Sequence, residues 1–137
     1  LMYKQTDEYD TPWVVIDFQD ALVAPYIYDV VALLRDSYLE LAPDLVSQLL
    51  DDYVEMAGEA DLPWADDPSN VRRAFHLQTV QRKLKDAGRF IFIDREKGNS
   101  DFLEYYEPSI RYVDHALAQL PGWDELRDLL HRVEPAL

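Results

Sequence analysis

The chain has 137 residues and a formal charge of −14, from 27 acidic and 13 basic side chains. Its length and its hydrophobic fraction of 48% suit one domain, residues 1–137, with a core of its own. The acidity argues against general nucleic-acid binding, because negative charge repels phosphate. With no cysteine, these residues offer no disulfide, zinc–thiolate site or thiol nucleophile, and no apolar run is long enough to span a membrane. We therefore expect a cytoplasmic protein.

The first residues have the pattern of a β-hairpin. Apolar residues at 1–3 are followed by a polar turn at 4–10 and a second apolar run at 12–16. The continuous apolar character of 13–16 predicts a strand that is buried on both faces. The chain begins as if the first strand had been entered midway, so we expect a domain fragment with more protein upstream.

Asp17 follows this strand directly. A carboxylate at the end of a rigid strand projects into the adjoining cleft and is a candidate functional group. Aspartate is also a common turn residue, so a purely structural turn is the alternative.

The periodicity then changes from strand to helix. Apolar residues at helical spacing predict one helix from about residue 27 that stops before Pro43, and a second from Pro43 to about Gly58. The inward face of the second helix is predicted to carry Leu45, Leu49, Leu50, Tyr53 and Val54.

A loop at 60–68 precedes the longest predicted helix. Asp67 and Pro68 have the pattern of an N-cap and a first helical position, and the helix should run to about Ile93. Gly88 is a possible point of close approach by another backbone or a ligand. The candidate inward residues of this helix are Val71, Ala74, Phe75, Val80, Leu84, Ala87 and Ile91.

A polar turn is predicted at 94–100, then a helix opened by Pro108 and a last helix after Pro121 and Gly122. The three histidines, His76, His115 and His131, lack metal-ligand spacing. No serine lies in a G-x-S-x-G elbow and the glycines form no phosphate-binding loop, so the sequence supports neither a zinc enzyme nor a serine hydrolase. The fold class is mainly α, or α+β overall, with a small hairpin at the start.

A specific motif follows the hairpin. It consists of Val15-Ile16-Asp17-Phe18-Gln19-Asp20-Ala21, Pro25 and then Tyr28-Asp29-Val30-Val31-Ala32-Leu33-Leu34-Arg35-Asp36-Ser37-Tyr38. This motif resembles the C-terminal lobe of aminoglycoside-phosphotransferase-like kinases, and within them the cell-wall-recycling kinases that phosphorylate the anomeric hydroxyl of N-acetylmuramate and N-acetylglucosamine. The specific part of the resemblance spans about residues 1–38.

The resemblance implies the helical C-lobe of a protein-kinase-like fold, with ATP and Mg²⁺ as cofactors. Asp17 would bind the metal, and Asp20 either a second metal or the substrate, or it would only cap a turn. Asp29 would be partly buried and would support the catalytic loop. The catalytic base and the ATP-binding N-terminal lobe would lie upstream of Leu1, so the fragment alone should be inactive.

Substrate recognition would come from the helical lobe. Eight of the 13 cations lie between residues 72 and 97, where an anionic ligand would be least repelled, although a solvated helix face is the favoured explanation of such a cluster. Candidates for stacking on a sugar or pairing with an acid are Trp64, Arg82, Lys85 and Phe90, although Trp64 could simply cover the core. The acceptor could instead be an aminoglycoside, choline or a homoserine-like amine. A non-catalytic binding or regulatory module derived from the kinase fold is the alternative of another class.

Overall fold

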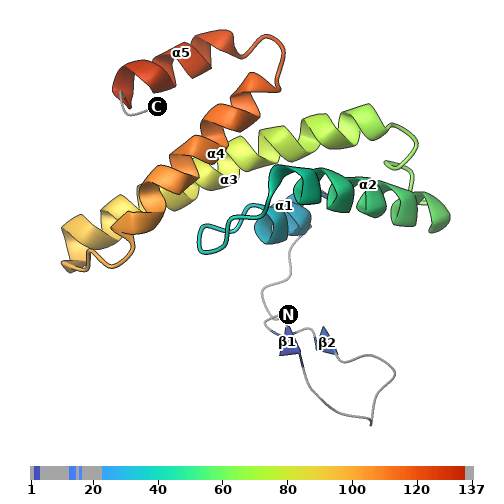
Figure 1. Ribbon diagram of the computed structural model, residues 1–137, viewed down its shortest axis with the longest axis horizontal. Helices are drawn as coiled ribbons and strands as arrows, with labels where there is room; N and C mark the ends of the chain where they lie inside the picture. Colours follow the sequence, from blue (N-terminus) through green and yellow to red (C-terminus); the bar gives the residue numbers. More distant parts are fainter. Residues whose placement is uncertain (1, 4–12, 15, 17–22, 135–137) are drawn as a thin grey trace.

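The computed structural model describes residues 2–3, 13–14, 16 and 23–134. It is mainly helical, as the sequence predicts (Figure 1). The elements are β1 (Met2–Tyr3), β2 (Trp13–Val14), α1 (Tyr28–Leu34), α2 (Pro43–Glu59), α3 (Pro68–Lys97), a 3₁₀ turn (Leu103–Tyr105), α4 (Tyr106–Ala118) and α5 (Asp124–Val133). Among these described helices, none combines the length and the apolar character that crossing a bilayer requires.

The predicted hairpin is present as two antiparallel strands. Met2 lies opposite Val14 and Tyr3 opposite Trp13, whose rings are 5.4 Å apart and edge to face. The prediction that 13–16 is buried on both faces is wrong for the part that is described. Trp13 is 58% exposed and Ile16 47%, because the described sheet contains only these two strands.

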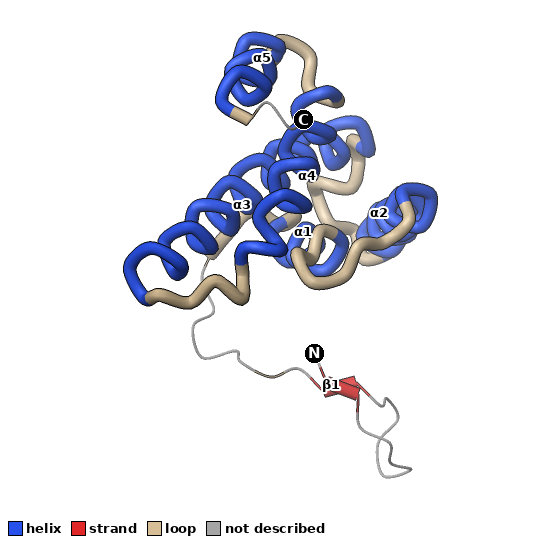
Figure 2. The backbone as a smooth tube through the Cα atoms, turned by 60° about the vertical axis from the view of Figure 1, so that its left-hand side comes forward, coloured by secondary structure: helices blue, strands red, loops and turns tan. Residues whose placement is uncertain are grey.

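Helix α3 is the longest helix, and α1, α2 and α4 pack against it (Figures 1 and 2). As predicted, it begins after an N-cap, where Asp67 accepts a hydrogen bond of 3.1 Å from the Asn70 amide. It continues four residues beyond the predicted end, to Lys97, and the left-handed φ of 63° at the C-cap residue Gly98 ends the helix. Gly88 lies within the unbroken helix, and apart from its chain neighbours and the adjoining backbone of its own helix, no described atom comes within 4 Å of the place where a Cβ would stand.

The C-terminal half of α3 packs against α4, and α5 crosses the end of α4 (Figure 1). Arg127 and His131 of α5 both bond to Asp114 of α4, at 2.7 and 2.6 Å. The apolar residues of this core are Val80, Ala87, Ile110, Val113, Ala116, Leu117, Leu120 and Leu130.

A second core joins α1 and α2 to the N-terminal half of α3. Its buried residues are Ile27, Val31, Leu34, Val46, Leu50, Val71 and Phe75. Of the predicted face of α2, Leu50 is buried and Tyr53 and Val54 pack against the core, whereas Leu45 and Leu49 are 42% and 36% exposed. The reason is that α2 meets its neighbours along a narrow stripe, narrower than its apolar face.

Residues 83 and 84 of α3 reverse the predicted pattern of burial. Leu84 is 41% exposed, whereas Lys83 is 1% exposed. The buried stripe of α3 passes through Thr79, Ala87 and Phe90. Position 83 is four residues from both Thr79 and Ala87, so it lies on the stripe, and position 84 lies beside it.

Candidate functional site

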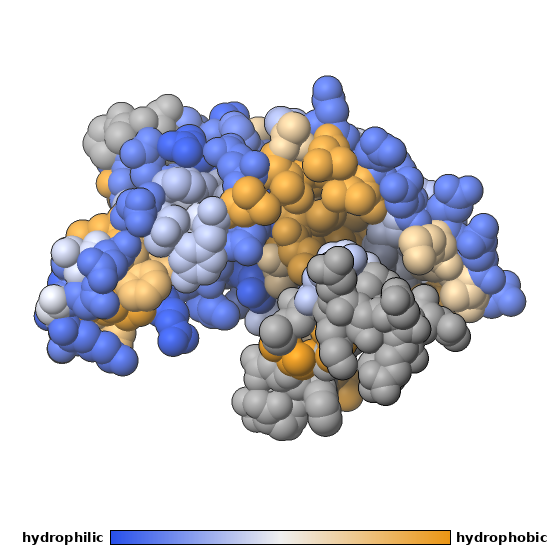
Figure 3. Space-filling model, turned by 60° about the horizontal axis from the view of Figure 1, so that its bottom comes forward, coloured by the Kyte–Doolittle hydropathy of each residue, from blue (hydrophilic) through white to orange (hydrophobic). Residues whose placement is uncertain are grey.

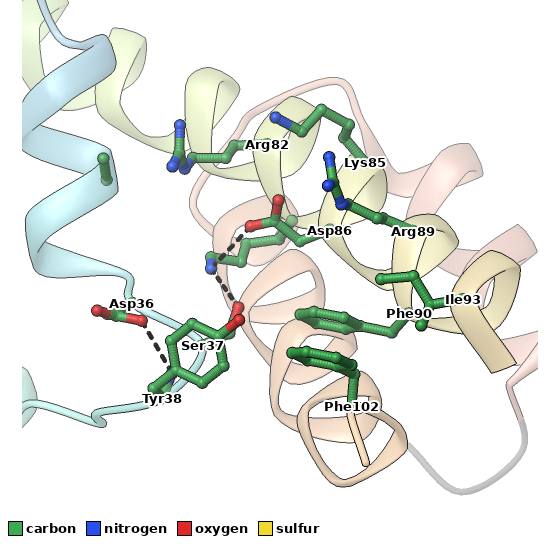
Figure 4. Close-up of a pocket in the computed structure, with 12 residues that line it drawn as sticks. Asp36, Ser37, Tyr38, Arg82, Lys85, Asp86, Arg89, Phe90, Ile93 and Phe102 are labelled. Atoms are coloured by element: carbon green, nitrogen blue, oxygen red, sulfur yellow. Dashed lines mark hydrogen bonds and ion pairs between the residues drawn. The ribbon is translucent and has the colours of Figure 1, made fainter. Parts of the chain in front are cut away.

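A pocket of about 520 Å³ lies between α3, the loop that follows α1 and the segment that precedes α4 (Figure 4). This volume falls within the usual range for small-molecule sites, roughly 300–1,000 Å³. We call it the basic pocket. It is lined by Ala32, Asp36, Ser37, Tyr38, Arg82, Lys83, Lys85, Asp86, Arg89, Phe90, Ile93 and Phe102.

Helix α3 supplies most of the charge. Arg82, Lys85 and Arg89 are spaced at i, i+3 and i+7, which places them on one face of the helix (Figure 4). The four cations of the lining and its two carboxylates, Asp36 and Asp86, leave a formal charge of 4 − 2 = +2. An anionic group is therefore favoured here in a chain that is strongly acidic overall.

Lys83 forms the inner end of the pocket. Its Nζ donates hydrogen bonds of 2.8 Å to Ser37 Oγ and 3.2 Å to the Asp86 carboxylate. It also lies 5.8 Å from the centre of the Tyr112 ring. Burial lowers the pKa of Lys83, although Asp86 acts in the opposite direction.

The loop after α1 is held against α3 and α4 by hydroxyl groups. Ser37 Oγ lies 3.3 Å from Ser109 Oγ, and Ser109 donates a hydrogen bond of 2.8 Å to the Tyr105 carbonyl of the preceding turn. Asp36 accepts a bond of 2.9 Å from the Tyr38 amide. Together with the bond from Lys83, these contacts fix the polar groups of the pocket on three elements.

Aromatic rings form the opposite wall. Phe90 and Phe102 stack nearly parallel, with ring centres 6.2 Å apart (Figure 4). At the other end of the pocket the Arg82 guanidinium lies 5.0 Å from the centre of the Tyr28 ring. The pocket therefore offers cations and carboxylates for polar groups and an aromatic face for a sugar ring or another flat apolar surface.

Three of the substrate-binding residues predicted from the sequence come together here. Arg82, Lys85 and Phe90 all line the basic pocket. Trp64 does not, because its ring stacks on Tyr26 at 4.4 Å and on Tyr53 at 5.0 Å beside the core of α1 and α2. Its role in binding stays a prediction.

The predicted acidic residues lie elsewhere. Asp29 is exposed in the first turn of α1, so the prediction that it is partly buried is wrong for the described residues. Asp17 and Asp20 lie outside the described residues. Within the described part of the chain, no group of three or more histidine, aspartate or glutamate side chains could hold a metal ion.

The sequence analysis did not identify Lys83, Asp86, Arg89 and Ser37 as site residues, although all four line the pocket. Two signals could have pointed to them. The pair Lys83–Asp86 has the i, i+3 spacing of a helical ion pair. Arg89 lies one turn beyond Lys85 on the same face. Ser37 has no such signal, because its contact with Lys83 depends on the packing of the α1 loop.

Comparison with known proteins confirms the resemblance to the amino-sugar kinases. The chain is 35% identical to N-acetylmuramate/N-acetylglucosamine kinase of Pseudomonas aeruginosa, over 85% of this chain and 34% of that protein. It is 38% identical to the protein of the same name from Neisseria meningitidis, over 82% and 37%. The corresponding protein of Pseudomonas putida is 30% identical, over 88% and 35%.

The chain thus spans about a third of the length of the curated relatives it matches. No family model matches it, and no solved structure does. The similarity covers far more of the chain than the motif at residues 1–38, and it includes the region of the basic pocket in α3, since no more than 18% of the chain lies outside any of the three matches.

Proposed function

We propose that this chain is the C-terminal, substrate-binding lobe of an ATP-dependent cytoplasmic kinase that phosphorylates the anomeric hydroxyl of N-acetylmuramate or N-acetylglucosamine. The observation that carries the proposal is the similarity to three proteins named N-acetylmuramate/N-acetylglucosamine kinase over most of the chain. The basic pocket supports it, because its groups suit an amino sugar that bears an acid.

In this proposal the sugar lies in the basic pocket. Phe90 and Phe102 offer an aromatic wall for the apolar face of the ring, and Asp36 can accept hydrogen bonds from sugar hydroxyls. N-acetylmuramate carries a carboxylate, whereas N-acetylglucosamine does not. Arg82 and Lys85 would pair with that carboxylate, and such charge-assisted hydrogen bonds are about twice as strong as neutral ones.

The phosphoryl-transfer machinery belongs to residues that the structure does not describe or that are outside this chain. Asp17 is the proposed Mg²⁺ ligand, with Asp20 as a possible second ligand or substrate contact. Mg²⁺ bound with ATP would neutralise charge on the phosphates. Because the described residues contain no metal cluster, this assignment rests on the motif alone. Asp29 is proposed to support the catalytic loop, and its exposure leaves its carboxylate accessible to such a partner.

The exposed apolar surface is consistent with a lobe that meets other protein. Figure 3 shows apolar side chains gathered on the middle of one face, with hydrophilic surface on both sides. The exposed apolar residues of the α1 region include Val23 and Leu33, the latter 58% exposed. Contiguous apolar patches on soluble proteins commonly mark interaction surfaces. The remainder of the kinase is the proposed partner, and the 137-residue lobe alone is expected to be inactive.

An ATP-consumption assay tests the proposal. The full-length protein would be given N-acetylmuramate, N-acetylglucosamine and a panel of amines, as wild type and as Asp17→Ala. Turnover on an amino sugar, lost in Asp17→Ala, is the expected result. Turnover on an amine alone would indicate an aminoglycoside, choline or homoserine-like acceptor. Silence on all acceptors, with intact folding and no magnesium-dependent ATP binding, would indicate the non-catalytic module.

The position of the substrate is tested by charge-removing variants in the same assay. Arg82→Met and Lys85→Met should each raise KM for N-acetylmuramate about tenfold, the effect of losing roughly 1.4 kcal/mol of binding, and should change KM for N-acetylglucosamine much less. Arg95→Met is the matched control, because Arg95 is exposed on α3 and does not line the pocket. Equal effects on both sugars would contradict the assignment of the carboxylate.

A further inference from the structure

A second cavity, of about 330 Å³, lies between α3, α4 and the start of α2. Its lining combines four side chains that can carry positive charge, Arg35, Arg72, His76 and His115, with apolar groups such as Leu50. None of the described lining residues is an aspartate or a glutamate. The proposed kinase activity makes no use of this cavity.

Arg35 is held in an unusual way for a charged side chain. Its guanidinium lies 5.3 Å from the centre of the Phe75 ring and 5.1 Å from that of Tyr112. Among the described residues it forms neither an ion pair nor a hydrogen bond through its side chain. Burial lowers the pKa of Arg35, while Tyr112 and then the Glu40 carboxylate act in the opposite direction. Both rings therefore contact the guanidinium, and its N–H groups have no acceptor within the part of the chain that the structure describes.

Tyr112 contributes an independent observation. Its side chain lines the same cavity and the residue is 6% exposed, yet its hydroxyl has no hydrogen-bond partner among the described residues. Buried polar atoms are nearly always bonded, so an unpartnered hydroxyl beside a cavity indicates a missing partner. The guanidinium can only donate hydrogen bonds and the hydroxyl can donate one, so a ligand that satisfies both is an acceptor of hydrogen bonds, and the charge of Arg35 favours a negative one.

The surroundings favour an anion further. Burial first, and then the charges of Arg35 and Arg72, lower the pKa of His76. Arg72 is itself paired with Asp51 on α2. Burial first, and then the charges of Glu40 and Asp36, raise the pKa of Tyr112, while Arg35 and Arg111 act in the opposite direction; neither carboxylate lines the cavity.

We propose that this cavity is a binding site for a small organic anion, a carboxylate or a phosphate ester, held by Arg35 and the Tyr112 hydroxyl with its apolar part against Leu50 and Phe75. The site is separate from the basic pocket but adjoins it. The ring of Tyr112 contacts one cation from each site, because its centre is 5.1 Å from the guanidinium of Arg35, which lines the second cavity, and 5.8 Å from Nζ of Lys83, which lines the basic pocket. An anion at Arg35 would therefore act on a residue shared with the proposed substrate site.

The test is a titration of the full-length protein followed by NMR at His76. Inorganic phosphate and butyrate, as the probes for the two anion chemistries, would be added at constant pH and constant ionic strength. We expect saturable shifts of the His76 ring resonances, which report on this cavity and not on the basic pocket. His76→Gln identifies the signal. Saturation by butyrate alone assigns a carboxylate site, and saturation by phosphate alone a phosphate site.

Three variants make the test specific. Tyr112→Phe removes only the hydroxyl and should weaken binding about fivefold, the value of roughly 1 kcal/mol for one hydrogen bond. Arg35→Met should abolish the saturable response. Arg89→Met, the matched removal of an arginine from the basic pocket, should leave it intact.

The proposal is overturned if neither probe saturates, if Tyr112→Phe binds as tightly as wild type, or if the response disappears in Arg89→Met and persists in Arg35→Met. Because Arg35 packs between two rings, Arg35→Met could impair folding. In that case Tyr112→Phe, which retains the ring, decides the question alone. None of these outcomes depends on turnover, so they are distinguishable from failure of the kinase assay.

Discussion

Replacement of the buried Lys83 should destabilise the protein through the charge that it leaves behind. Methionine has a similar length and fills most of the same volume, so Lys83→Met creates little cavity. It removes the donor to Ser37 and the cation beside Asp86, whose side chain is 18% exposed. The main cost is therefore the uncompensated carboxylate.

The magnitude follows from the burial of the pair. Removal of one partner of a buried ion pair typically costs about 3–5 kcal/mol. Asp86 retains some contact with water, so we expect Lys83→Met to lower the free energy of unfolding by about 2 kcal/mol. Asp86→Leu should cost more, because Lys83 is only 1% exposed and would keep an unpaired charge.

A double-mutant cycle measured by urea unfolding at pH 7 tests this reasoning. The double variant Lys83→Met/Asp86→Leu replaces the pair with apolar groups, which is often nearly neutral. It should therefore be more stable than the sum of the single variants predicts by at least about 1 kcal/mol. Additive effects would refute the view that the two charges depend on each other.

The pH dependence gives a second test of Lys83. The pKa of Lys83 in the folded state lies below the ordinary value of 10.5. Between the folded-state pKa and 10.5, the unfolded chain therefore keeps a proton on this lysine that the folded chain has lost. The stability of the wild type should then rise with pH toward 10.5 through this group, and Lys83→Met should remove that contribution. An unchanged pH slope in the variant would contradict the lowered pKa.

Three further substitutions test local features by chemical unfolding. Gly88→Ala should stabilise the protein by about 1 kcal/mol, because this exposed position inside the helix has room for a methyl group. Gly98→Ala should cost about 1–2 kcal/mol, because φ is positive at this residue. A Gly98→Ala variant more stable than Gly88→Ala would contradict the geometry of α3. Burial and the hydrogen bond to Glu134 raise the pKa of Tyr106 to about 12, so the folded state retains a proton that the unfolded state loses near pH 10. The contribution of Tyr106 to the free energy of unfolding is complete below pH 10 and is lost as pH rises through about 12. Tyr106→Phe should remove this dependence of stability on alkaline pH.

The helices could be predicted from the sequence because their signals are local. Asp67 and Pro68 define the start of α3, and the periodic apolar residues define its direction. The end was missed by four residues because the C-cap signal, Gly98, lies in a polar stretch that looks like a loop. Arg82 and Lys85 could be grouped for a similar local reason, since i, i+3 spacing places both on one face wherever the helix packs.

The burial of single residues could not be predicted in this way. Lys83 is buried and Leu84 exposed, the reverse of the prediction, because burial depends on which stripe of α3 meets α4. The two positions are separated by only one residue, a rotation of about 100° around the helix. The exposure of Asp29 and the stacking of Trp64 on Tyr26 and Tyr53 depend likewise on contacts between distant segments. Tertiary packing decides these features, and hydrophobic periodicity contains too little information to determine it.

The residues at the end of the kinase-like motif form the loop after α1, and this loop contributes side chains to both cavities. Arg35 lies on the second cavity, whereas the next two residues, Asp36 and Ser37, line the basic pocket. The bond from Lys83 to Ser37 and the ring of Tyr112 beside Arg35 both depend on the position of this loop. A displacement of the loop would therefore change both cavities together. An anion in the second cavity and a sugar in the basic pocket would each favour one position of Arg35, Asp36 and Ser37. The two binding events should therefore be thermodynamically coupled, with a strength set by how far the two ligands favour the same position of this loop.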